Sequence, residues 1–90
     1  MKVLKKDGSL QDFDPSKIRL VLERISDESH QPLTASDIDM IMKDIKESVE
    51  RWPYRNINTL GIRYIIGETL KKDGFSHIAE AYDSFERGFA

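Results

Sequence analysis

The chain has 90 residues, of which 14 are lysine or arginine and 16 are aspartate or glutamate, giving a formal net charge of −2. This length suits a single domain, residues 1–90, and is too short for a second core or a large catalytic apparatus. The chain has no cysteine, which excludes disulfides, thiol catalysis and cysteine-ligated zinc or iron–sulfur clusters.

The distribution of apolar and charged residues narrows the possible partners. No apolar run approaches the roughly 20 residues of a membrane helix, and the first residues lack the apolar segment of a signal peptide. We therefore expect a cytoplasmic protein without a membrane partner. Balanced charge argues against binding duplex nucleic acid, which calls for a strong basic excess. His30 and His77 have no second ligand at metal-binding spacing, so no metal site is expected.

The first segment predicts a β-hairpin. Residues 2–5 and 10–13 flank a turn at residues 6–9, whose Asp7-Gly8 pair is favoured where φ must be positive. Two short strands are not stable alone, so they must pack on helices supplied by the rest of the chain.

Two amphipathic helices are predicted to follow the hairpin. The first is capped by Asp14 and ends near Ser26. The second is capped by Thr34 or Ser36 and is stopped by Pro53.

Two further helices are predicted in the second half of the chain. A connector at residues 55–59 leads to a third helix capped by Thr59, and Asp73-Gly74 ends that helix as a C-terminal glycine cap. Ser76 opens the fourth helix. The expected architecture is α+β, mostly α, with an N-terminal two-stranded hairpin packed on a four-helix bundle. Apolar residues spaced three or four apart in these helices are expected to face the core: Ile18, Val21, Leu22, Ile25, Ile38, Ile41, Met42, Ile45, Val49, Trp52, Ile62, Ile65, Ile66, Leu70, Ile78, Ala81, Tyr82, Phe85 and Phe89.

Three lysines are expected to meet near the hairpin. Lys5 and Lys6 lie beside its turn, and Lys17 lies one turn into the first helix, whose N-terminal end carries partial positive charge. A polyphosphate suits such a gathering of positive charge. On charge alone the alternative stays open that these lysines are simply solvated.

Four segments form an ordered pattern: residues 3–9, residues 13–18, the polar turn at residues 58–62, and the closing helix at residues 78–82 with Phe85. In this order they resemble segments of the ATP-cone, the allosteric nucleotide-binding domain at the N-terminus of many ribonucleotide reductases. Together these segments span nearly the whole chain.

The resemblance implies a regulatory domain and not an enzyme. Such a domain binds ATP or dATP, with Mg²⁺, and couples occupancy to the oligomeric state or activity of ribonucleotide reductase. Its partner would be a reductase subunit or a second copy of itself. The chain would be a regulatory fragment of a larger enzyme or a separate small protein acting on one.

The resemblance also implies which residues touch the nucleotide. Val3, Lys5 and Lys6 match the strand motif that contacts adenosine and phosphates. The second basic residue is commonly arginine in the family. Lys6 has the same charge but lacks the guanidinium fork with which arginine binds phosphate in a bidentate way. Lys17 matches a phosphate-binding lysine.

Three more positions are implied to face the nucleoside. Asp14 matches a polar residue near the sugar, and Thr59 matches a polar contact at the third helix. Gln11 stands where relatives can carry glutamate, and its amide can both accept from and donate to adenine. Arg87 departs from the family's spacing after Phe85, so no phosphate contact is carried over to it.

Two alternative functions remain. One is a nucleotide-responsive transcriptional regulator, although the zinc ribbon that accompanies the ATP-cone in such bacterial proteins is missing here. The other is a partner-binding module of deoxynucleotide metabolism. A phosphoryl-transfer enzyme is disfavoured, because neither a Gly-x-x-x-x-Gly-Lys-Ser/Thr loop nor a paired acid set is present.

Overall fold

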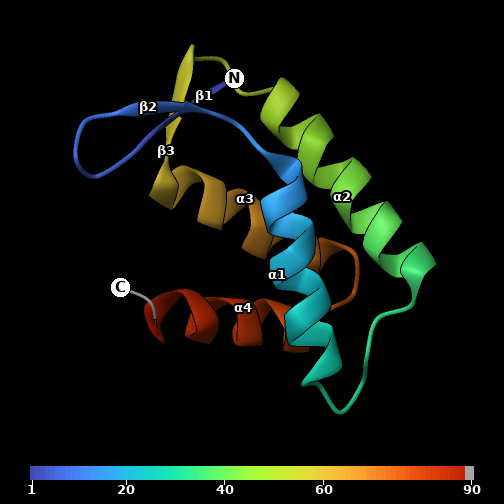
Figure 1. Ribbon diagram of the computed structural model, residues 1–90. Helices are drawn as coiled ribbons and strands as arrows, with labels where there is room; N and C mark the ends of the chain where they lie inside the picture. Colours follow the sequence, from blue (N-terminus) through green and yellow to red (C-terminus); the bar gives the residue numbers. More distant parts are fainter. Residues whose placement is uncertain (89–90) are drawn as a thin grey trace.

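A small β-sheet and four helices make up the fold, seen here in a computed structural model that describes the backbone of residues 1–88 and the side chains of residues 1–85 (Figure 1). Strand β1 (Lys2–Leu4) pairs antiparallel with β2 (Leu10–Asp12), which confirms the predicted hairpin. Gly8 has a φ of +88° in the turn between them. A side chain is strained in that conformation, which explains the glycine.

A third strand occupies part of the segment that the sequence predicted to be a connector. Strand β3 (Asn56–Asn58) pairs parallel with β1, so the sheet has the order β2-β1-β3. The indole N–H of Trp52 donates to the Asn56 carbonyl at 3.0 Å and holds the approach to this strand. The connector prediction for residues 55–59 is therefore wrong, and the sheet has three strands in place of two. The α+β, mostly helical class is confirmed.

The helix starts follow from short polar side chains. Asp14 caps α1, its carboxylate accepting from the Ser16 backbone N–H at 3.0 Å, as predicted. Thr34 caps α2 in a reciprocal arrangement with Asp37. The bounds are Pro15–Asp27 for α1, Ala35–Glu50 for α2, Thr59–Lys72 for α3 and Ser76–Gly88 for α4.

The cap of α3 differs from the prediction. The Asn58 side chain accepts from the Gly61 backbone N–H at 2.7 Å, so Asn58 is the cap and Thr59 is the first residue of the helix. Strand β3 thus runs directly into α3. Gly74, with a φ of +93°, follows the end of α3 as predicted.

Each helix packs against two others, in the ring α1–α2–α3–α4–α1, and the core fills the space between them (Figure 1). Ala81, predicted to face the core, is exposed, and Ala79 is buried in its place. The prediction for Phe89 lies outside the described residues. None of the helices in residues 1–88 has the length and hydropathy needed to span a lipid bilayer. The buried hydrophobic residues are Val3, Leu22, Ile25, Ile38, Ile41, Met42, Ile45, Val49, Ile57, Ile65, Ile66, Leu70, Ile78, Ala79 and Tyr82.

Candidate functional site

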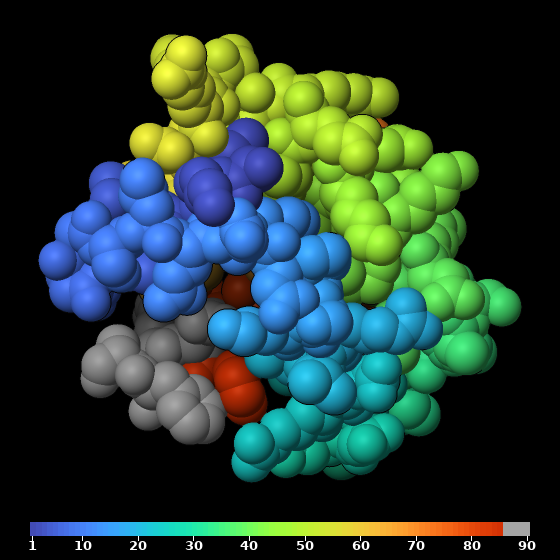
Figure 2. All heavy atoms as spheres, turned by 45° about the horizontal axis from the view of Figure 1, so that its top comes forward, coloured from blue at the N-terminus to red at the C-terminus, as the bar shows by residue number. Residues whose placement is uncertain are grey.

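A pocket of about 190 Å³ opens between the sheet, α1 and the N-terminal half of α3. Figure 2 shows the hollow between the hairpin and α1. The described residues that line it are Val3, Lys5, Gln11, Asp12, Phe13, Asp14, Lys17, Ile18, Val21, Thr59, Ile62, Arg63 and Tyr82.

The sheet contributes residues from two adjacent strands. Val3 and Lys5 are two residues apart, so they lie on the same face, and Val3 pairs with Gln11 across the hairpin. Two backbone hydrogen bonds fix the turn at Lys5: its N–H donates to the Ser9 carbonyl at 2.9 Å, and its carbonyl accepts from Gly8 at 3.0 Å. The Lys5 backbone therefore has a defined position at the rim of the pocket.

Helix α1 presents one stripe of residues to the pocket. Asp14, Lys17, Ile18 and Val21 follow one another at steps of three, one and three residues, which places them on a single helix face. The polar members of this stripe lie at the N-terminal end, where the backbone N–H groups create partial positive charge. The half-buried Ile18 and Val21 form an apolar wall behind them.

Helix α3 supplies the opposite wall. Thr59, Ile62 and Arg63 lie on one face because they are three and four residues apart. Tyr82 of α4 reaches the same pocket and is 5% exposed.

The carboxylates of the pocket are engaged by neighbouring groups. A hydrogen bond and the charge of Lys2 lower the pKa of Asp12. Hydrogen bonds from the Ser16 side chain and backbone lower the pKa of Asp14, with a smaller contribution from the charge of Lys17. Both carboxyls are therefore ionised at neutral pH.

The three cations of the pocket differ in their partners. The Arg63 guanidinium lies 3.5 Å from the Asp83 carboxylate. Neither Lys5 nor Lys17 forms an ion pair with any side chain in residues 1–85. Within the described side chains, no carboxylate competes with an anionic ligand for these two ammonium groups through an ion pair.

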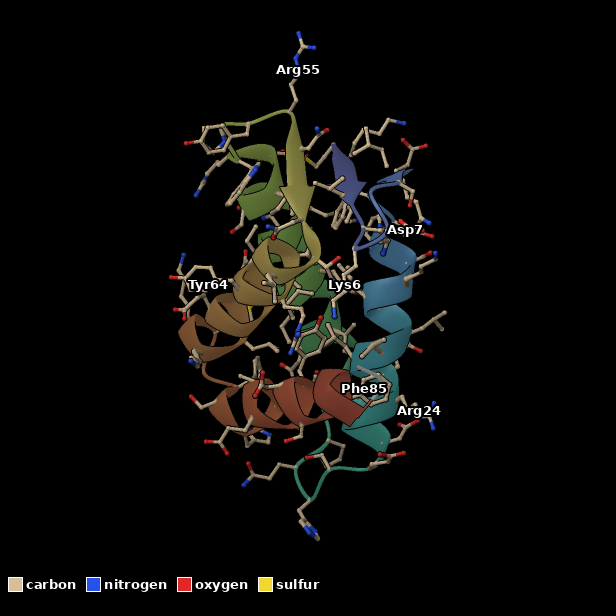
Figure 3. All side chains as sticks on the ribbon, turned by 90° about the vertical axis from the view of Figure 1, so that its left-hand side faces the viewer. Lys6, Asp7, Arg24, Arg55, Tyr64 and Phe85 are labelled. Carbon is tan, nitrogen blue, oxygen red and sulfur yellow. The ribbon has the colours of Figure 1, made fainter. Side chains whose placement is uncertain are left out.

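Six of the seven binding residues that the resemblance implied line this one pocket: Val3, Lys5, Gln11, Asp14, Lys17 and Thr59. Lys6 does not line it and is exposed in the β1–β2 turn (Figure 3). The side chain of Arg87 lies outside the described residues.

Arg63 was not among the site residues predicted from the sequence. Its position four residues after Thr59 on α3 is the signal that could have found it, since residues at that spacing share a helix face. Ile18, Val21, Ile62 and Tyr82 were expected in the core and in fact also line the pocket.

The arrangement can hold a flat apolar group next to an anionic group. Phe13, Ile18, Val21 and Ile62 offer apolar surface, the Gln11 amide offers a donor and an acceptor, and ammonium groups lie at the rim. Among the side chains of residues 1–85, no group of three or more histidine, cysteine, aspartate or glutamate residues is placed to hold a metal ion.

One comparison with known proteins gives a match over almost the entire chain. The family model described as the ATP cone domain matches residues 1–85. Domains of this family bind ATP or dATP as effectors, regulate without catalysing, and are typically found in ribonucleotide reductases. No curated protein sequence gives a significant match.

Proposed function

The chain belongs to the ATP-cone family, and from this premise we propose that it binds ATP or dATP in the pocket between the sheet, α1 and α3. Occupancy then controls the oligomeric state or the activity of a ribonucleotide reductase. The partner is a reductase subunit or a second copy of this chain.

The observation that carries the proposal is the position of two lysines that line a pocket with apolar walls and form no ion pair with the side chains of residues 1–85. Lys5 directly follows β1, Lys17 belongs to the first turn of α1, and both line the same pocket. A phosphate chain carries several negative charges, so two ammonium groups from different elements hold it better than one. The positive N-terminal end of α1 adds to this attraction.

The nucleoside then occupies the interior. We place adenine against Ile18, Val21 and Ile62, where Gln11 can accept from its amino group and donate to a ring nitrogen. On the N7 edge of the base, guanine presents two acceptors, O6 and N7, so an amide with one acceptor and one donor group pairs with guanine less well than with adenine. Asp14 and Thr59 supply polar contacts to the sugar.

The pocket is smaller than the nucleotide it is proposed to hold. Its volume of about 190 Å³ lies below the roughly 300–1,000 Å³ of sites that enclose a whole drug-sized ligand. The base and sugar therefore enter, and the phosphates extend along the exposed rim between Lys5 and Lys17. Mg²⁺ enters the site already bound to the phosphates. The protein itself neutralises phosphate charge through its lysine ammonium groups.

Nucleotide binding regulates only if two assemblies differ in their affinity for the nucleotide. The shift between them is limited by that difference in affinity. The sheet and the three helices that line the pocket all contribute to the molecular surface as well, so a ligand that draws them together alters a surface available to a partner.

Titration calorimetry with ATP, dATP, GTP and adenosine tests the binding proposal. We expect ATP and dATP to bind more tightly than GTP, because Gln11 pairs with adenine, and more tightly than adenosine, because the lysines hold phosphate. Equal weak heats for ATP and GTP would refute recognition of adenine. Recovery of intact ATP after prolonged incubation is the expected result for a regulatory domain.

Light scattering with and without dATP tests the coupling. A mass that increases with dATP supports self-association. An unchanged mass, with dATP shown to be bound, excludes self-association and leaves a reductase subunit as the partner. Titration of that subunit into the dATP complex then provides the decisive measurement.

A further inference from the structure

Arg63 of α3 stands between two cavities of the molecule. On one side it lines the candidate nucleotide pocket with Lys5 and Lys17. On the other side it lines a groove between α3 and α4, whose rim includes the exposed residues Leu60 and Tyr64. Figure 3 shows Tyr64 on the outer side of α3. One side chain therefore borders both the site where a nucleotide is proposed to bind and a surface open to a partner.

The present partner of Arg63 holds it weakly. The Arg63 Nη2 and Asp83 Oδ1 atoms are 3.5 Å apart, and the two side chains are 26% and 52% exposed. Water screens an ion pair of this exposure, and such pairs contribute little to stability. Arg63 can therefore leave Asp83 for a stronger anion at small cost.

A nucleoside polyphosphate is such an anion. It carries more negative charge than one carboxylate, and its oxygens match the planar fork of a guanidinium. Lys5 and Lys17 would already hold the phosphates along the rim of the pocket that Arg63 also lines, so the local concentration of phosphate near Arg63 would be high.

We propose that Arg63 is a third cation of the nucleotide site, and that it exchanges Asp83 for phosphate when ATP or dATP binds. The proposal rests on the proposed function and adds a route by which occupancy reaches the surface. Movement of Arg63 takes a positive partner away from Asp83 of α4 and leaves the α3–α4 groove more negative.

The size of the charge change follows from the groove's lining. Its described residues include two cations, Arg63 and Lys71, and three carboxylates, Glu68, Glu80 and Asp83, giving a balance of −1. Withdrawal of Arg63 into the nucleotide pocket leaves one cation against the same carboxylates, a balance of −2. The affinity of a partner that contacts Leu60 or Tyr64 on this groove would change with the charge of the groove.

Binding constants for ATP and adenosine, measured on Arg63→Gln, Asp83→Asn and the double variant, test the exchange. We expect Arg63→Gln to lower the affinity for ATP about tenfold, since the substitution removes a charged hydrogen bond, and to leave the affinity for adenosine unchanged. We expect Asp83→Asn to raise the affinity for ATP severalfold, because it removes the competing anion, and to have no effect on that affinity in the Arg63→Gln background. Arg63→Lys, which keeps the charge without the fork, should lie between wild type and Arg63→Gln.

Lys71→Gln is the matched control, because it removes a positive charge from the same helix and groove without touching the nucleotide pocket. It should leave ATP affinity within about twofold of wild type. Thermal unfolding of each variant checks that the fold is retained, and loss of adenosine binding in Arg63→Gln would indicate a structural effect and count against the exchange.

Two outcomes overturn the inference, and they are separable from failure of the proposed function. If wild-type protein binds ATP and Arg63→Gln binds it equally well, Arg63 is not part of the site. If Asp83→Asn weakens ATP, Asp83 positions Arg63 and does not compete for it. If wild-type protein fails to bind ATP at all, the proposed function itself is wrong.

Discussion

Gly61 in the first turn of α3 lies directly against Ile57 of β3. A Cβ atom at Gly61 would be 2.8 Å from the Ile57 Cγ1 atom, closer than real Cβ atoms approach a neighbour. Ile57 is 1% exposed and pairs with Val3 in the sheet. The missing side chain at Gly61 is what allows β3 to pass into α3 without a loop, and this junction places Thr59 beside the pocket.

Gly61→Ala is therefore expected to destabilise the protein. Ile57 is held in the core and has little room to retreat, so the free energy of unfolding should fall by about 1–3 kcal/mol. Gly67→Ala, on the same helix, is the matched control, because a Cβ there meets nothing within 4 Å. That change should stabilise the helix by about 0.5–1 kcal/mol. Urea unfolding of both variants gives the comparison, and a similar effect from the two substitutions would contradict the role assigned to Gly61.

The three lysines near the hairpin should contribute unequally to nucleotide binding. Lys5 and Lys17 line the pocket and Lys6 does not. Lys5→Gln and Lys17→Gln should therefore each lower the affinity for ATP about tenfold or more. Lys6→Gln serves as the internal control, with an expected change of about twofold, because only long-range attraction is lost. Calorimetry at low and physiological salt measures both effects. Equal losses for Lys5→Gln and Lys6→Gln would show that the site is a diffuse positive surface and not a pocket.

Gln11 should determine the preference for adenine. Gln11→Leu removes the amide's donor and acceptor while keeping a side chain of similar size, so the binding free energy of ATP should become less favourable by about 1–3 kcal/mol. GTP, which pairs poorly with the amide, should change little. Gln31→Leu changes the same residue type outside the pocket and is the control. Preserved ATP selectivity in Gln11→Leu would mean that the base is recognised elsewhere.

Local signals made most of the fold predictable. Asp14 before Pro15, Thr34 before α2, and glycine at positions 8 and 74 each fix the backbone within a few residues, and the structure has helix starts and turns at these places. Strand β3 could not be found in this way. It is three residues long and exists because Ile57 pairs with Val3, more than 50 residues away in the chain.

The candidate site was predictable where spacing decides which way a side chain points. Lys5 follows β1 directly and lines the pocket together with Val3, whereas Lys6 lies one residue further on, in the β1–β2 turn, and does not line it. Arg63 could not be predicted as a site residue, because it reaches the pocket only through the position of α3 relative to the sheet. That position follows from the β3–α3 junction, which the sequence pattern does not reveal.

A pair of carboxyls links α2 to the end of α3. Asp73 is the residue that ends α3, and its Oδ2 atom is buried without a hydrogen-bond partner among the described residues. Burial raises the pKa of Asp73, and the neighbouring Asp44 carboxyl raises it further, because a protonated Asp73 can donate to Asp44 and because Asp44 is negatively charged. A negative charge at a helix C-terminus is also unfavourable. The ionised form of Asp73 is therefore poorly accommodated in the folded protein.

This pair should make the protein less stable as the pH rises. Because the pKa of Asp73 is higher in the folded than in the unfolded state, the folded state binds more protons in the range just above about pH 4. The contribution to stability is complete below that range and is lost as pH rises through the folded-state pKa. Asp73→Asn replaces the ionised group with a neutral amide that can donate to Asp44, and should raise the melting temperature at pH 7, by about 4–8 °C for each kcal/mol gained in a domain of this size.

The same substitution should have a smaller effect near pH 3.5, where most of the Asp73 carboxyl is protonated in both states. Asp27→Asn, which also removes an acid at a helix C-terminus but from an exposed position, separates the effect of the helix dipole from that of the carboxyl pair. Thermal melts of both variants from pH 3.5 to pH 8 provide the measurement. A gain for Asp73→Asn that is independent of pH, or one matched by Asp27→Asn, would show that Asp44 and Asp73 do not titrate as a pair.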